Sequence, residues 1–205
     1  MAVIGITGLA QNGKSSAAKR LEERWNYEPF AFADQLKSMA LVLDPFVSIN
    51  NPDMDNPLYA SEVAYLMRLS ALVTVEGWEK AKAKPEVRRF LQVLGTEGAR
   101  GHFGPNVWVD ALDIQLSESY AQDAVISDVR FQNEVDYIKE LAGTMLRVVR
   151  IMPDGQPFRA TDGAHASERD IIGLPVDYEL PVRDGDMDSL YHQVDIIAHS
   201  LAREV

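Results

Sequence analysis

The chain has 205 residues, a net charge of −11 and a composition that is ordinary for a folded globular protein. Its length allows one domain with a sizeable core and with lobes inserted into it. The acidic balance argues against a nucleic-acid partner, because such binding depends on neutralising phosphates, but it is compatible with a small nucleotide bound together with a metal ion. The absence of cysteine excludes disulfides and a thiolate nucleophile.

The first apolar run, Ala2 to Thr7, is too short to cross a membrane and lacks the basic flank of a signal peptide. We therefore expect no membrane partner and a cytoplasmic location. Because symmetric dimers are the commonest assemblies of soluble proteins, a homodimer is the default expectation for the oligomeric state.

The motif that organises the sequence follows this run directly. Residues 8–15 read GLAQNGKS, which fits the phosphate-loop (P-loop) spacing G-x-x-x-x-G-K-[ST]. In such a loop the backbone amides surround the phosphates, the lysine reaches the β- and γ-phosphate oxygens, and the hydroxyl holds Mg²⁺. The alternative is a glycine-rich turn that binds nothing. The residues expected to bind a nucleoside triphosphate are Gly8, Gln11, Asn12, Gly13, Lys14, Ser15 and Ser16.

Strands and helices alternate after this loop. A helix is expected at about Lys14 to Trp25, a second strand at Pro29 to Ala33 and a second helix from Asp34 to about Leu43. This alternation predicts an α/β fold in which a parallel sheet is flanked by helices, as in the P-loop nucleoside triphosphatases.

From Asp44 to Pro57 the sequence is dense in turn residues and predicts a surface loop. Helices are expected after it at about Tyr59 to Val75, at Pro85 to Arg100 and from Pro105 to about Tyr120. These elements predict a helical insertion that covers residues 44–120.

The helix predicted at Pro85 to Arg100 has two distinct faces. Apolar residues fall on one side at 100° per residue, and a polar stripe lies on the other. By itself this stripe is either a solvated face or the wall of a binding site. Its members are Arg89, Gln92, Thr96 and Arg100.

The run from Ala124 to Asp128 has the character of a buried strand with a carboxylate at its carboxyl end, where open α/β sheets bind ligands. A helix follows, and the next strand is expected at Met145 to Ile151. The segment from Pro153 to Pro175 is rich in glycine, proline, aspartate and arginine and predicts an excursion from the sheet. A last strand near Tyr178 and a helix from about Asp186 to Arg203 complete a single domain.

Several segments outside the phosphate loop form a second pattern. They read FADQLK at residues 32–37, RFLQVLGTE at 89–97 with Arg100, NVW at 106–108 and ISDVRFQNE at 126–134; HASE at 165–168 fits more loosely. In these segments the chain resembles the phage deoxynucleoside monophosphate kinase family, within the P-loop kinases. The segments occur in the family's order and span nearly the whole chain.

The resemblance implies a single kinase domain over residues 1–205, which transfers the γ-phosphoryl group of ATP to a deoxynucleoside monophosphate with Mg²⁺ as the metal cofactor. Residues 44–120 would bind the acceptor, and residues 152–175 would form a lid. Small-molecule nucleotides would be the partners, and a phage protein would work in the host cytoplasm. No general base is needed, because the acceptor phosphate has a second pKa near 6 and is largely anionic at neutral pH.

The resemblance assigns catalytic roles to Lys14, Asp128 and Arg130. Asp128 would support the metal together with Ser15; the alternative is a structural carboxylate that caps a turn or pairs with Arg130. Arg130 would contact the acceptor phosphate or the transferring group; the alternative is an ion pair with Glu134, four residues later.

The implied acceptor-binding residues are Asp34, Lys37, Arg89, Gln92, Arg100, Trp108, Arg130 and Glu134. For three of them the residues themselves allow a structural role equally well. Asp34 could be a helix N-cap, and Lys37 could point to solvent. Trp108 could belong to the core instead of stacking on a base.

Three arginines are candidates for the lid: Arg150, Arg159 and Arg169. Because arginines on polar loops are usually only solvated, we expect one or two of the three to contact phosphate. His165 and Glu168 fit a family motif, but Ser167 with Asp170 also reads as a helix-capping box.

Two departures from the family pattern bear on this assignment. Gln35 stands where the family has proline, which affects the start of the helix. The sequence LPVR at 180–183 replaces an asparagine-containing turn before the last helix, where base contacts would be made.

Two other functions compete with this one. The first is a P-loop kinase for another phosphorylated acceptor, such as phosphomevalonate or a dephosphocoenzyme. The second is a nucleotide-dependent binding module, which would be expected to carry switch elements and a guanine-selective Asn-Lys-x-Asp sequence; the chain contains no such sequence.

Overall fold

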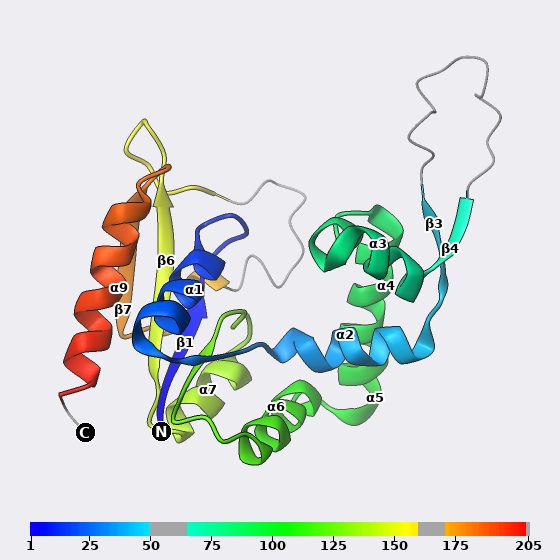
Figure 1. Cartoon of the computed structure of the whole chain (residues 1–205), viewed down its shortest axis with the longest axis horizontal. Helices are drawn as coiled ribbons and strands as arrows, with labels where there is room; N and C mark the ends of the chain where they lie inside the picture. Colours follow the sequence, from blue (N-terminus) through cyan, green and yellow to red (C-terminus); the bar gives the residue numbers. More distant parts are fainter. Residues whose placement is uncertain (50–64, 160–170, 204–205) are drawn as a thin grey trace. The chain divides into compact units, whose positions relative to one another are not determined.

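The computed structural model describes residues 1–49, 65–159 and 171–203 (Figure 1). The chain divides into two compact units: unit 1 comprises Met1–Phe32 and Val109–Val205, and unit 2 is Ala33–Trp108. Unit 2 overlaps the insertion predicted at residues 44–120, with different bounds. None of the helices in the described ranges combines the length and apolarity that a bilayer crossing requires.

Unit 1 contains a five-stranded parallel sheet with the strand order β2-β5-β1-β6-β7. The predicted parallel sheet is therefore confirmed. Its central strand, β1, is buried from Val3 to Thr7 because helices cover both faces of the sheet. The strands are β1 (Ala2–Thr7), β2 (Glu28–Phe30), β5 (Asp123–Ile126), β6 (Thr144–Ile151) and β7 (Tyr178–Arg183).

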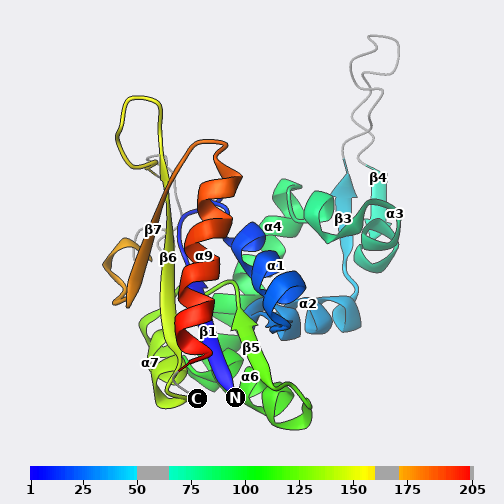
Figure 2. The ribbon, with the colours of Figure 1, turned by 60° about the vertical axis from the view of Figure 1, so that its left-hand side comes forward.

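Two helices, α1 (Lys14–Trp25) and α9 (Met187–Leu201), cover one face of this sheet and lie beside each other (Figure 2). Helix α7 (Gln132–Glu140) covers the other face. It packs so closely on β1 that a Cβ at Gly5 would lie 2.5 Å from Cδ1 of Ile138. Helix α6 (Val107–Glu118) is joined to α7 by the Tyr137 hydroxyl, which donates to Asp113 over 2.9 Å.

A polar clasp fixes α1 to α9 away from the phosphate loop. Arg20 donates to both carboxylate oxygens of Asp195 over 3.0 and 2.6 Å, and the Trp25 indole donates to the same carboxylate over 2.8 Å. The hydrogen bond from Arg20 holds the pKa of Asp195 below its ordinary value. The helix that begins at the phosphate loop is thus anchored along its length.

Unit 2 has a core of its own, formed by Ala40, Val47, Leu69, Leu72, Ala81 and Val87. Apolar residues of the helix predicted at Pro85 to Arg100 pack against this core. The elements are α2 (Phe32–Leu43), β3 (Phe46–Ile49), β4 (Tyr65–Arg68), α3 (Leu69–Ala81), α4 (Pro85–Gln92), the π-helix η3 (Val93–Arg100) and α5 (Gly101–Phe103).

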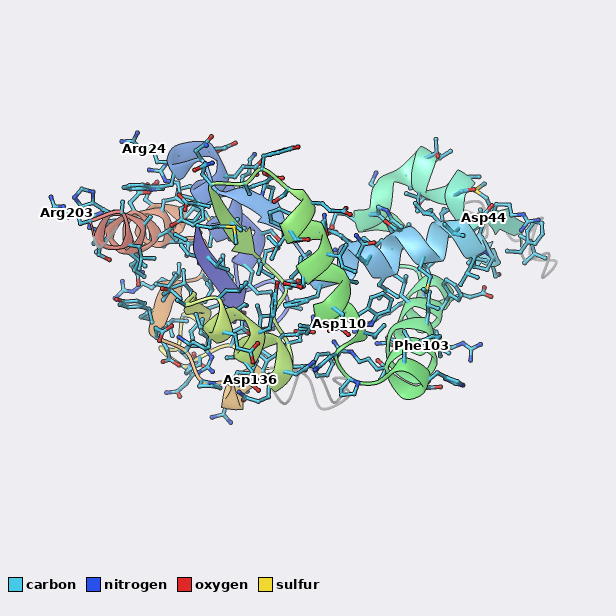
Figure 3. The ribbon with its side chains drawn as sticks, turned by 90° about the horizontal axis from the view of Figure 1, so that it is seen from below. Arg24, Asp44, Phe103, Asp110, Asp136 and Arg203 are labelled. Atoms are coloured by element: carbon cyan, nitrogen blue, oxygen red, sulfur yellow. The ribbon has the colours of Figure 1, made fainter. Side chains whose placement is uncertain are left out.

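The helix expected at Tyr59 to Val75 is confirmed from Leu69 onward and is wrong over Tyr65–Arg68. Residues 59–64 lie outside the described ranges, and Tyr65–Arg68 form a strand that pairs antiparallel with β3, with Val47 opposite Met67. The helix begins only at Leu69. Its first turn is held by the Ser70 amide, which donates to the Asp44 carboxylate over 2.8 Å. Figure 3 labels Asp44, where α2 ends and the chain turns into β3.

One helix start differs from the prediction. Helix α2 begins at Phe32, so Asp34 lies inside the first turn and the N-cap alternative considered for it is wrong. The strand expected near Tyr178 is confirmed as β7, and the sequence LPVR at 180–183, which stands in place of the family's turn, belongs to this strand. Pro181 is tolerated there because β7 is an edge strand, where a missing amide hydrogen removes no bond from a second neighbour.

Candidate functional site

The loop between β1 and α1 has the backbone geometry of an anion-binding loop. Three of its residues adopt positive φ angles: Gly8 (142°), Gln11 (63°) and Gly13 (95°). Gly13 precedes α1, whose first turn contains no acidic residue. The amides at the start of α1 therefore present positive partial charge to a ligand, as phosphate binding requires.

One carbonyl of β6 determines how this loop lies. A Cβ at Gly8 would come within 2.6 Å of the Val148 carbonyl oxygen, so only glycine fits there. The Asn12 side chain is 7% exposed and donates from Nδ2 to the same oxygen over 3.1 Å. Gly8 and Asn12, near the two ends of the loop, thus both lie against the Val148 carbonyl oxygen of β6.

Lys14 and Ser15, at the start of α1, are the two side chains to which the motif assigns functions. The Lys14 ammonium donates to the carbonyl oxygens of Gly8 and Leu9, each over 2.8 Å, and so folds back over the loop. Ser15 is exposed. The ammonium group therefore lies against the loop in which the motif places the phosphates.

The segment after β5 adds a second set of groups at the same sheet edge. β1 and β5 are neighbouring parallel strands, so Gly8 and Asp128 both follow strand ends at the carboxyl edge. Asp128 accepts a hydrogen bond on Oδ1 from the Phe32 amide over 2.9 Å and so caps the start of α2. This contact corresponds to the structural alternative for Asp128; its role toward a metal stays a prediction.

Arg130 and Glu134 do not form the ion pair considered from their spacing. Glu134 is 2% exposed, and its Oε2 accepts hydrogen bonds from the backbone amides of Arg130 and Phe131 over 2.7 and 3.2 Å. The Arg130 side chain is exposed and makes no ion pair with any residue in the described part of the chain. The arginine is therefore available to a ligand, and the glutamate supports its backbone.

All the acceptor candidates of unit 2 except Trp108 are partly or fully exposed. Lys37 and Asp34 lie one turn apart on α2 and form an ion pair at 2.8 Å. Arg89 is exposed and Gln92 is half-buried. Arg100 donates to the Pro105 carbonyl oxygen over 2.7 Å, a bond that holds the turn after α5.

Trp108 is buried beside the π-helix η3. Gly95 packs against α2, where an added Cβ would lie 3.0 Å from Leu36, and its carbonyl oxygen accepts a 2.9 Å hydrogen bond from the Trp108 indole. Trp108 is 5% exposed. This burial favours the core alternative over stacking on a base. Because a π-helix bonds i to i+5, the polar stripe expected at 100° per residue does not continue beyond Gln92.

The lid candidates are only partly covered by the structure. Arg150 pairs with Asp184 at 2.9 Å and lies 5.4 Å from the ring centre of Phe158, which gives it a structural role. Arg159 is exposed. The remaining candidates lie outside the described residues: His165, Ser167, Glu168, Arg169 and Asp170.

One residue of this site was not predicted from the sequence. Thr7, the last residue of β1, is fully buried and donates from its hydroxyl to the Val129 carbonyl oxygen over 2.8 Å. Its only signal in the sequence was a polar residue at the end of an apolar run.

Comparison with known proteins identifies the family. The sequence model of the family described as deoxynucleotide monophosphate kinase matches residues 53–194, which is more than half of the chain. A protein of Acanthamoeba polyphaga mimivirus, provisionally named a deoxynucleotide monophosphate kinase, is 27% identical over 213 residues, covering 95% of this chain and 94% of its own.

The deoxynucleoside-5′-monophosphate kinase of Escherichia phage T5 is 30% identical over 95 residues, covering 45% of this chain and 38% of its own. A crystal structure of a Thermus thermophilus protein aligns over 98% of this chain and 97% of its own, with a TM-score of 0.43 and 17% identity. The chain belongs to the deoxynucleotide monophosphate kinase family, whose members are phosphotransferases acting on nucleotide monophosphates.

Proposed function

We propose that the chain transfers the γ-phosphoryl group of ATP to a deoxynucleoside 5′-monophosphate, giving ADP and the corresponding diphosphate. The observation that carries this proposal is the phosphate loop, in which a lysine folds over a turn held open by two positive-φ glycines. Asp128 and Arg130 follow the neighbouring strand at the same sheet edge. Family membership favours a nucleotide acceptor over the other phosphorylated acceptors considered from the sequence.

In this reaction an oxygen of the acceptor phosphate bonds to the γ-phosphorus as the bond from that phosphorus to the β–γ bridging oxygen breaks. Such a transfer depends on positioning and on neutralising charge more than on covalent participation of the protein. We assign Lys14 to the β- and γ-phosphate oxygens. Arg130, whose exposed guanidinium has the planar geometry for bidentate phosphate contact, is assigned to the acceptor or the transferring group.

Mg²⁺ fits the residues at this edge. Among the described residues no group of three or more acidic or histidine side chains could hold a metal alone. This agrees with an ion that is bound by the donor phosphates, water and one or two protein ligands. Ser15 and Asp128 would hold it, and the bound ion would neutralise charge that develops on the phosphate oxygens.

We assign recognition of the acceptor to unit 2, through Asp34, Lys37, Arg89, Gln92 and Arg100. The support for this assignment is that the family match includes the last three and that all five side chains are at least partly exposed. Trp108 is left out because it is buried, and Glu134 because its carboxylate binds backbone amides. A cytoplasmic location and a homodimer remain predictions from the sequence.

The test is an acceptor screen. The protein is incubated with ATP, Mg²⁺ and each deoxynucleoside monophosphate in turn, including modified pyrimidine monophosphates, and the ADP formed is measured. We expect acceptor-dependent ADP with at least one of them. If none supports turnover while phosphomevalonate or dephospho-coenzyme A does, the proposed acceptor is wrong and the phosphate-loop assignment stands.

A further inference from the structure

We infer that Thr7 is a positioning residue for phosphoryl transfer, because its buried hydroxyl holds the segment that carries Arg130 against the strand that leads into the phosphate loop. The inference rests on the proposed role of Arg130. It adds a residue that neither the phosphate-loop motif nor the family segments quoted above contain.

Two hydrogen bonds join the end of β1 to the segment that carries Arg130. The Thr7 hydroxyl donates to the Val129 carbonyl oxygen over 2.8 Å, and the Val129 amide donates to the Ile6 carbonyl oxygen over 3.2 Å. Both polar groups of Val129 are therefore bound by consecutive residues of β1. Thr7 and Val129 are 0% and 1% exposed, so water does not compete for these bonds.

Glu134 holds the backbone at Arg130 and at the residue after it. The buried Glu134 carboxylate accepts hydrogen bonds from the amides of Arg130 and Phe131. The backbone of Arg130 is thus fixed by buried groups before and after it, while its side chain is exposed. A long side chain whose backbone is fixed in advance loses less conformational freedom when it binds phosphate.

Thr7 also precedes Gly8 directly in the sequence. The residue that binds Val129 is therefore adjacent to the loop assigned to the donor phosphates. A displacement of about 1 Å between reacting groups can reduce the rate by about 100-fold. The hydroxyl therefore fixes the position of the Arg130 segment relative to the phosphate loop, although more than a hundred residues separate the two in the sequence.

The competing explanation is that Thr7 only stabilises the core. Three variants separate these roles. Thr7→Val keeps the shape and removes the hydroxyl, and Thr7→Ser restores the hydroxyl. Val194→Ala opens a space in the core between β1 and α9, in a helix that carries neither the phosphate loop nor Arg130.

The measurement is the steady-state rate with ATP and the best acceptor of the screen, well below each variant's Tm, combined with a double-mutant cycle. We expect Thr7→Val to lower kcat by about tenfold or more, with the KM for ATP changed less than about twofold. Thr7→Ser should recover most of this loss, and Val194→Ala should lower Tm without changing kcat. In an Arg130→Ala background, Thr7→Val should have no further effect on kcat, because Thr7 acts through Arg130.

An unchanged kcat in Thr7→Val, or the same loss with and without Arg130, would overturn the inference. Hydrogen exchange of residues 127–131 supplies a readout that does not need activity: Thr7→Val should speed it, while exchange in α9 stays as in the wild type. If no deoxynucleoside monophosphate supports ADP formation, the proposed function fails. Unchanged hydrogen exchange of residues 127–131 in Thr7→Val would separately contradict the role of the Thr7 hydroxyl in holding this segment.

Discussion

The phosphate loop of unit 1 is built from backbone atoms, whereas the acceptor candidates of unit 2 are long side chains. Each part of the loop has a fixed neighbour: Gly8 and Asn12 meet the carbonyl of Val148, and Lys14 binds two loop carbonyls. In unit 2, Arg89 is exposed and Arg100 donates to the Pro105 carbonyl oxygen in a nearby turn. A site made of backbone is formed before the ligand arrives, but a site made of exposed side chains is completed by the ligand.

The largest effect should come from Lys14→Ala. The ammonium is the charge placed over the loop, so its removal should lower kcat by about 100- to 1,000-fold, as for the loss of other preorganised charge-stabilising groups. Steady-state ADP formation measures this. The matched control is Lys19→Ala on the same helix, whose ammonium forms an exposed pair with Glu23 and should be replaceable without loss. Activity of Lys14→Ala equal to that of this control would contradict the assignment.

Gly8→Ala should come next. The added Cβ would meet the Val148 carbonyl oxygen at 2.6 Å, and the residue would have to keep a φ of 142°. We expect a loss of about 1–3 kcal/mol in the free energy of unfolding, together with weaker ATP binding. Urea unfolding and calorimetric titration with ATP measure the two effects.

Gly173→Ala is the control for this prediction, because an added Cβ there meets no atom within 4 Å and its φ is not positive. Its stability should change by less than about 0.5 kcal/mol. Should both variants lose the same stability, the close approach of Gly8 to β6 would not be the cause.

A smaller and more selective effect is expected from Arg100→Ala. Loss of one phosphate contact should raise the KM for the acceptor about tenfold, equivalent to about 1.4 kcal/mol, and leave the KM for ATP unchanged. Lys82→Ala removes one positive charge from the same unit at an exposed pair with Glu79 and should change neither constant. Equal changes in both KM values would mean that Arg100 stabilises unit 2 and does not recognise the acceptor.

The smallest effect should come from Trp108→Phe. This variant keeps an aromatic ring but loses the hydrogen bond to the Gly95 carbonyl, so stability should fall by about 1 kcal/mol. The KM for the acceptor should not change, because the ring is buried. A raised acceptor KM at unchanged stability would restore the stacking role considered from the sequence.

The parts of the fold that could be predicted are those with local signals. Helix α1 was predicted with its observed bounds, Lys14–Trp25, because the loop motif places its start and Asn26 ends it in a left-handed conformation. The pairing of β3 with β4 could not be predicted, since it joins residues about twenty positions apart and the intervening turn residues have no regular period. Strand formation at Tyr65–Arg68 therefore depends on a partner that local periodicity does not reveal.

The candidate site divides in the same way. The positions of Lys14 and Ser15 at the start of α1 could be predicted from the motif's spacing within eight residues, and their roles stay predictions. The supporting roles of Asp128 and Glu134 were not, because each depends on which backbone amide the fold brings to the carboxylate. For Glu134 the spacing suggested a partner in the Arg130 side chain, and the structure gives it the Arg130 backbone amide.

The sequence by itself determined that the chain is an α/β protein with a phosphate loop, since glycine positions, a lysine and alternating apolar runs are local properties. Only the tertiary structure decided that Thr7 and Glu134 hold the segment of Arg130 and that Trp108 belongs to a core. The physical reason is that a hydrogen bond needs its donor and acceptor within about 3 Å. For residues more than a hundred positions apart in the chain, such as Thr7 and Val129, the fold alone sets that distance.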